Sequence, residues 1–222
     1  MTSIPNSIPK LGSSFSSCIG PGVDVRGGEP PKPLSKPMIF PRFRRGARPD
    51  TISSLYGTIV AQARLPCFYQ DYAVPDTVNG RFDVIVLHLS AVLERIATEP
   101  ALRDVGQGLF DRFWADMDNN LREMGTGDLA VPKRMKELGE AYYGRAGAYR
   151  AALADQDGNA LVEALKRNIY GEAADGGAPA RLAAYMREMV RGLAGQDAGS
   201  LRGGTLRFPN PRAIPALGDV RG

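Results

Sequence analysis

Residues 113–153, FWADMDNNLREMGTGDLAVPKRMKELGEAYYGRAGAYRAAL, decide the fold of this 222-residue chain. In the first half of the stretch, apolar side chains recur at steps of three and four residues, the spacing that places them on one face of an α-helix. Gly125-Thr126-Gly127 interrupts the pattern, which then resumes through Leu153. The stretch therefore predicts two amphipathic helices joined by a glycine-containing corner.

The same periodicity continues on the N-terminal side of this stretch. It predicts a helix that begins at Asp50 or Thr51 as the capping residue and ends before Pro66, because the residue before a proline disfavours the α region. A short helical turn over 66–69 follows. Asp76 or Thr77 caps the next predicted helix, which runs to residue 97, and a further one spans 100–124.

On the C-terminal side, Asp128 is the expected cap of a helix running to residue 153. Shorter helices are expected at 159–170 and 179–194, separated by the loop GEAADGGAP. No strand pattern persists, so the predicted fold is all-α, a single compact multi-helix domain over residues 50–200 with extended segments at both ends. The segment 201–222 contains glycines and prolines and is expected to lie extended on the surface.

The first 49 residues differ from the rest in composition. They contain nine of the 17 prolines and few apolar residues, which predicts a disordered leader. Met38 is an alternative start, and on that interpretation residues 1–37 lie outside the native product. Eight basic and three acidic residues give the first 50 positions a charge of +5, so that the remaining 172 sum to −1 out of a total of +4. A basic cluster at Arg42, Arg44, Arg45 and Arg48 is a candidate for contact with a ribosome or an anionic membrane surface.

Composition and apolar run lengths limit the possible classes. The chain is 43% hydrophobic and 23% charged, as is usual for a globular protein, and no apolar run approaches the roughly 20 residues of a transmembrane helix. Cys18 and Cys67 are far apart and form no CxxC pair, which fits a reducing compartment. We therefore expect a cytoplasmic protein.

Recognisable catalytic chemistry is absent from the sequence. His88 is the single histidine, it lies in an apolar run, and its expected place is at a core margin with a hydrogen-bonded imidazole. The acidic run at 116–120 lacks the glycine and glutamate of a calcium loop, and no phosphate-binding glycine motif occurs. No metal or cofactor is predicted. A small helical enzyme with a carboxylate site at Asp116 and Glu140 remains an alternative.

Several residues of the 113–153 stretch are unusual for a helix that only packs internally. Gly144 and Gly147 each cost about 1 kcal/mol relative to alanine within a helix. Their small size would let another helix approach closely, either from the same domain or from a bound protein. The early basic cluster 133–136 lies where the helix dipole disfavours cations.

Two long blocks carry a family resemblance: LYGTIVAQARLPCFYQDYAVPDTVNGRFDVIVLHL at 55–89 and the whole stretch 113–153. Weaker similarity continues through ALKRNIYG at 164–171 and LRFPNP at 206–211. The chain resembles the ubiquinol–cytochrome c chaperone family, bacterial relatives of the mitochondrial chaperone for cytochrome b.

The resemblance implies a non-enzymatic assembly chaperone that binds newly synthesised cytochrome b. The basic cluster from Arg42 to Arg48 predicts, in addition, contact with the ribosome or with the cytoplasmic face of the inner membrane. A helical chaperone can receive an apolar client helix in a groove, and methionines suit adaptable surfaces. The client-contact candidates are Met117, Met124, Lys133, Arg134, Lys136, Tyr143 and Arg145. The remaining alternative is a basic-tailed RNA-binding or ribosome-binding module. No specific DNA contact is predicted.

Overall fold

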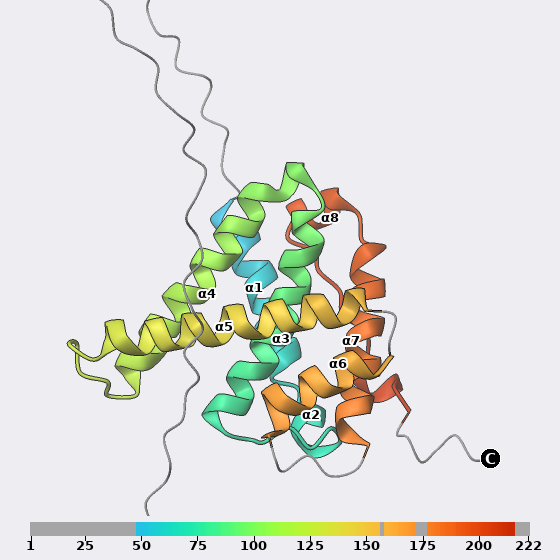
Figure 1. Cartoon of the computed structure of the whole chain (residues 1–222). Helices are drawn as coiled ribbons and strands as arrows, with labels where there is room; N and C mark the ends of the chain where they lie inside the picture. Colours follow the sequence, from blue (N-terminus) through green and yellow to red (C-terminus); the bar gives the residue numbers. More distant parts are fainter. Residues whose placement is uncertain (1–47, 156–157, 172–176, 216–222) are drawn as a thin grey trace, which may run out of the picture. The chain divides into compact units, whose positions relative to one another are not determined.

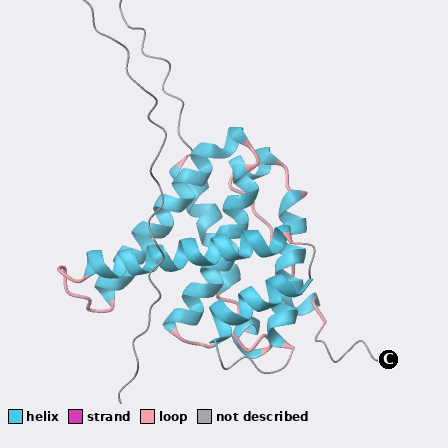
Figure 2. Ribbon diagram, viewed as in Figure 1, coloured by secondary structure: helices cyan, strands magenta, loops and turns pink. Residues whose placement is uncertain are grey.

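The computed structural model describes residues 48–155, 158–171 and 177–215, and within these ranges all regular structure is helical (Figures 1 and 2). The predicted all-α class is therefore confirmed. The helices are α1 Pro49–Ala63, α2 Cys67–Gln70, α3 Val78–Ala97, α4 Arg103–Glu123, α5 Val131–Ala154, α6 Gly158–Leu165, α7 Ala178–Ala194 and α8 Ala198–Arg202. Single turns add η1 Pro100–Leu102, the π-helical η2 Lys166–Tyr170 and η4 Pro211–Ala213. The leader expected over residues 1–49 lies almost entirely outside the described residues.

Helix α3 forms the centre of the domain. Every residue from Asp83 to Val92 is buried, because α1, α4, α5 and α7 all pack around this helix. A helix that is apolar on nearly all sides is stable only when it is enclosed in this way. The side chain of Thr77 accepts a hydrogen bond from the Gly80 backbone N–H at 3.1 Å, which confirms one of the two capping residues predicted for this helix.

Helices α4 and α5 form the predicted helical pair, and α5 crosses over α3 (Figure 1). The corner between them uses Gly125 at φ +81°, a conformation that favours glycine. The expected cap at Asp128 is wrong. Helix α5 begins only at Val131, and the Asp128 carboxylate instead accepts a hydrogen bond from Arg122 at 2.7 Å. Because the Asp128 carboxylate pairs with Arg122, it does not cap the backbone N–H groups at the start of α5.

The start of α1 also differs from the prediction. Pro49 is the first helical residue and Arg48 precedes it, so neither Asp50 nor Thr51 caps the helix. Proline is well tolerated in the first turn because its missing N–H would have no partner there anyway. Thr51 is buried and turns its hydroxyl toward the carbonyl oxygen of Arg202, at 3.4 Å.

The segment 201–222 is predicted to lie extended on the surface, but residues 201–202 belong to α8 and residues 216–222 lie outside the described residues. The part between them, the C-terminal segment 203–215, is not confined to the surface. Its backbone is largely extended, yet Leu206 and Pro211 are buried in the domain. The Tyr72 hydroxyl donates to the carbonyl of Pro211 at 2.5 Å, and the Gln62 side chain donates to the carbonyl of Pro209 at 3.2 Å. The segment therefore completes the core.

His88 lies in the middle of this core, not at its margin. Its Nδ1 is 2.8 Å from the carbonyl oxygen of Val84, which can only accept, so Nδ1 carries the proton and Nε2 accepts from the Tyr185 hydroxyl at 2.9 Å. The Tyr185 oxygen in turn accepts from the Gln62 amide at 3.0 Å. Complete burial lowers the pKa of His88 to about 4. The hydrogen-bonded series Gln62, Tyr185 and His88 therefore joins α1, α7 and α3.

This pKa predicts an acid-sensitive contribution to stability. An unfolded histidine titrates near 6.5, so between pH 6.5 and 4 the unfolded chain binds the proton and the folded chain does not. Stability from His88 is present above this window and is lost as the pH falls through it, by up to about 1.4 kcal/mol per pH unit. We expect the stability difference between the wild type and a His88→Gln variant to shrink from pH 7 to pH 4.5 in urea unfolding. A constant difference would contradict the assignment.

Candidate functional site

Two apolar grooves open along the α3–α5 pair, one beside the first half of each helix and one beside the second half. The first groove, which we name the methionine groove because Met117 and Met124 line it, has a volume of about 540 Å³ and is closed on a third side by the end of α4. The α7 groove has a volume of about 550 Å³ and is closed by α7. Both volumes fall in the range of pockets that bind ligands.

The methionine groove is built from side chains of three helices. Phe82 and Ile85 come from α3, Met117 and Met124 from α4, and Leu138 from α5. The two methionines differ in burial because Met117 lies within α4 and Met124 lies just beyond its end. Met117 faces inward and is buried, whereas Met124 follows the last helical residue and is 56% exposed.

Three of the predicted contact residues, Met117, Met124 and Arg134, meet in this groove. Arg134 lies on its rim and forms an ion pair with Glu137 at 2.8 Å. The two methionines come from positions seven residues apart on α4 and Arg134 from the following helix. Helical spacing places the two methionines on one face, and the packing of α5 against α4 brings Arg134 to them.

The other predicted contact residues lie elsewhere on α5. Lys133 and Lys136 are exposed in its first turns, and the Lys136 ammonium lies 3.8 Å from Glu140. Tyr143 is 63% exposed and packs beside Phe110 with ring centroids 6.2 Å apart. Of the basic cluster, Arg48 is exposed immediately before α1, while Arg42, Arg44 and Arg45 lie outside the described residues.

The predicted contact residue Arg145 has an internal partner. Its Nε lies 2.8 Å from Oδ1 of Asp83 at the crossing of α3 and α5, with side chains 22% and 5% exposed. The two atoms do not complete a well-directed hydrogen bond, and the Tyr149 hydroxyl is also buried without a partner among the described residues. Burial raises the pKa of Asp83 to about 6, and the Arg145 guanidinium opposes this shift.

Gly144 and Gly147 face open space. A Cβ atom at either position would meet no described atom within 4 Å. Close packing against another helix of the described domain is therefore the wrong explanation for these glycines. Their exposure leaves contact with a bound protein as the prediction for this face of α5.

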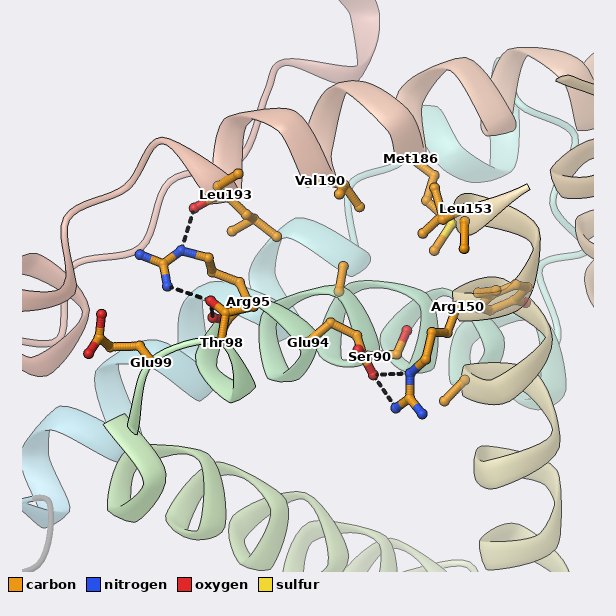
Figure 3. Close-up of a pocket in the computed structure, with 15 residues that line it drawn as sticks. Ser90, Glu94, Arg95, Thr98, Glu99, Arg150, Leu153, Met186, Val190 and Leu193 are labelled. Carbon is orange, nitrogen blue, oxygen red and sulfur yellow. Dashed lines mark hydrogen bonds and ion pairs between the residues drawn. The ribbon is translucent and has the colours of Figure 1, made fainter. Parts of the chain in front are cut away.

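The α7 groove was not predicted from the sequence. Leu153 of α5, Met186 and Val190 of α7 and small side chains of α3 make it apolar (Figure 3). Two arginines form hydrogen bonds between the helices that line this groove. Arg150 of α5 donates to Glu94 at 2.8 Å, and Arg95 of α3 donates to the carbonyl of Leu193 at 3.1 Å. The periodicity of each helix predicts which of its faces is apolar. It does not predict which apolar faces remain open after the helices have packed together.

Asp116 and Glu140, the two carboxylates of the alternative enzyme hypothesis, each have a polar partner elsewhere in the domain. Asp116 accepts a hydrogen bond from the Tyr56 hydroxyl at 2.9 Å, and Glu140 is exposed beside Lys136. The acidic run 116–120 lies within the continuous helix α4. In the part of the chain that the structure describes, no three histidine, cysteine or acidic residues are grouped to hold a metal ion, and no helix is long and apolar enough to cross a membrane.

These features define an all-helical protein with open apolar grooves. Residues 70–208 match the family model described as ubiquinol-cytochrome C chaperone, and the chain belongs to this family. The resemblance seen in the sequence is therefore confirmed.

Two relatives show how far this similarity extends. The crystal structure of the Cbp3 homolog from Brucella abortus is 38% identical and superimposes with a TM-score of 0.70, covering 76% of this chain and 94% of that one. The Xenopus laevis protein "Ubiquinol-cytochrome-c reductase complex assembly factor 1" is 26% identical over 128 residues, 57% of this chain. The match spans 64% of that relative, less than two thirds of its length.

Proposed function

We propose that this chain is a non-catalytic assembly chaperone that binds newly synthesised cytochrome b during the biogenesis of ubiquinol–cytochrome c reductase. Family membership supports the assembly role. The observation that carries the binding role is the methionine groove, an open apolar surface with the flexible side chain of Met124 at its edge. A helix-in-groove contact of this kind suits a client whose apolar helices are exposed before membrane insertion.

Two features favour this role over a carboxylate enzyme. The candidate carboxylates Asp116 and Glu140 do not line either groove. Each already has a polar partner: the Tyr56 hydroxyl donates to Asp116, and the Lys136 ammonium lies beside Glu140. The carboxylates that do line the grooves include Glu94 and Glu137, and both of these form ion pairs with arginines.

Site-specific photocrosslinking tests the proposal. A photoreactive amino acid at Met124 should label nascent cytochrome b several-fold more strongly than the same group at Glu163, an exposed position on α6 that lines neither groove. A third probe at Tyr143 reports on the exposed face of α5. Equal labelling at Met124 and Glu163 would contradict the groove assignment. Normal reductase levels in a strain lacking the gene would overturn the function itself.

A further inference from the structure

Four arginines surround the short helix α2 and the residues next to it. Arg64 and Arg81 line a small pocket with Pro66, Tyr69 and Gln70. On the other side, Arg181 donates to the backbone carbonyl of Asp71 at 3.0 Å, and the Arg212 guanidinium lies 3.9 Å from the Asp71 carboxylate. The guanidinium groups of Arg81, Arg181 and Arg212 thus contact residues 66–71, and Arg64 lines the adjoining pocket. We name this surface, with the loop 72–78, the α2 face.

Carboxylates neutralise only part of this charge. Asp76 forms a 2.7 Å ion pair with Arg81, and Asp71 is loosely paired with Arg212. Arg64 forms no ion pair among the described residues, and Arg181 donates to backbone carbonyls while lying over the Tyr72 ring. Four cations and two carboxylates leave a net charge of +2 on the α2 face. The chain from residue 51 onward has a net charge near zero, so this is a local concentration of positive charge.

Exposed apolar side chains accompany the arginines. Val78, which also lines the methionine groove beside Arg64 and Arg81, is 65% exposed. Ala73 and Pro75 in the preceding loop are exposed as well. Mixed arginine and apolar side chains on one surface suit the boundary between lipid head groups and acyl chains. Single-stranded RNA would instead need open aromatic rings for stacking, and the Tyr69 ring is half-buried with Arg81 over it at 5.7 Å.

We propose that the α2 face docks the protein on anionic phospholipid head groups. The arginines provide electrostatic attraction and Val78 enters the interfacial layer. This inference does not depend on client binding. It adds an orientation to the proposed function, because docking through this face places the methionine groove, which shares Arg64, Arg81 and Val78, next to the bilayer.

Vesicle co-sedimentation of the full chain tests the proposal. The vesicles contain 30% phosphatidylglycerol in phosphatidylcholine, or phosphatidylcholine alone. Arg64→Gln/Arg212→Gln should lower the partition coefficient on the anionic vesicles about 20-fold, since each cation near such a surface contributes roughly a fivefold effect. Binding to the neutral vesicles should be weak for all variants. Raising the salt from 50 to 300 mM should weaken the wild-type interaction.

A matched control separates the α2 face from overall charge. Arg103→Gln/Arg207→Gln removes the same two charges at exposed positions whose side chains form no ion pair in the described domain. We expect this variant to bind within twofold of the wild type. Thermal unfolding should show all three proteins folded. Equal losses in both double variants, or an unchanged Arg64→Gln/Arg212→Gln protein, would overturn the proposal. A single-stranded RNA oligonucleotide is tested in the same way. If it binds the wild type as tightly as the anionic vesicles do, or more tightly, and does not bind the α2-face variant, the partner of this face is RNA and not lipid.

Discussion

A chain that ends at Gly204 is expected to be largely unfolded, whereas a chain that ends at Pro215 should be as stable as the whole protein. Loss of the C-terminal segment removes the buried Leu206 side chain and the Phe208 ring, which packs edge-on against His88 with ring centroids 5.2 Å apart. Burial of one such side chain contributes about 1.5–3 kcal/mol.

The same truncation removes hydrogen-bond partners from one buried group, the Tyr72 hydroxyl, and from the partly buried Arg181. The Tyr72 hydroxyl loses the carbonyl of Pro211, and Arg181 loses the carbonyl of Ile214, which accepts at 3.1 Å. An unsatisfied buried group costs about 1–3 kcal/mol. The combined loss is about 5 kcal/mol or more, comparable to the whole stability of many domains.

Urea unfolding followed by circular dichroism measures this effect. The chain ending at Pro215 is the matched control, because it keeps every contact described for the C-terminal segment. Similar unfolding midpoints for the two truncated chains would show that the segment only covers a core that is stable without it.

This segment also shows where inference from sequence ends. Its prolines and glycines predict the largely extended backbone of residues 203–210, because both residue types disfavour the interior of a helix. They carry no information on burial. Leu206 and Phe208 have no regular period around them, so neither the burial of Leu206 nor the contact of Phe208 with the distant His88 is visible in the sequence.

Helical periodicity, by contrast, predicts most of the fold. The apolar stripe of α4 and the Thr77 cap of α3 are local features, and both appear in the structure. The grooves depend on tertiary arrangement. Met117 and Met124 have the same spacing as core positions, and only the packing of α4 against α3 leaves one buried and the other exposed. Asp83 was missed for the same reason, although a lone carboxylate at the edge of an apolar run is a signal of a buried charge.

Replacing Arg145 by methionine should destabilise the domain by about 3 kcal/mol at pH 8. The substitution keeps an apolar stem over the Phe82 ring but leaves the Asp83 carboxylate buried without its cation. Removing one partner of a buried ion pair costs about 3–5 kcal/mol, and the 22% exposure of Arg145 places the expected value at the lower end.

The loss should depend on pH in a defined direction. Asp83 has a pKa raised to about 6 from 3.8, so the folded state holds this proton more tightly than the unfolded state, and stability falls as the pH rises through this window. Without Arg145 the pKa rises further. The destabilisation caused by Arg145→Met should therefore be larger at pH 8 than at pH 5, where the carboxyl group is protonated in the variant.

Arg150→Met is the matched control for this prediction. Arg150 lies five residues further along α5 and pairs with Glu94, but its side chain is 66% exposed. Exposed pairs contribute about 0–1 kcal/mol, so its loss should be small at either pH. Asp83→Asn combined with Arg145→Met removes both charges and should recover most of the stability at pH 8. Urea unfolding at the two pH values measures all three variants. Equal effects of Arg145→Met and Arg150→Met, or no recovery in the double variant, would show that the charge pair at the α3–α5 crossing does not hold these helices together.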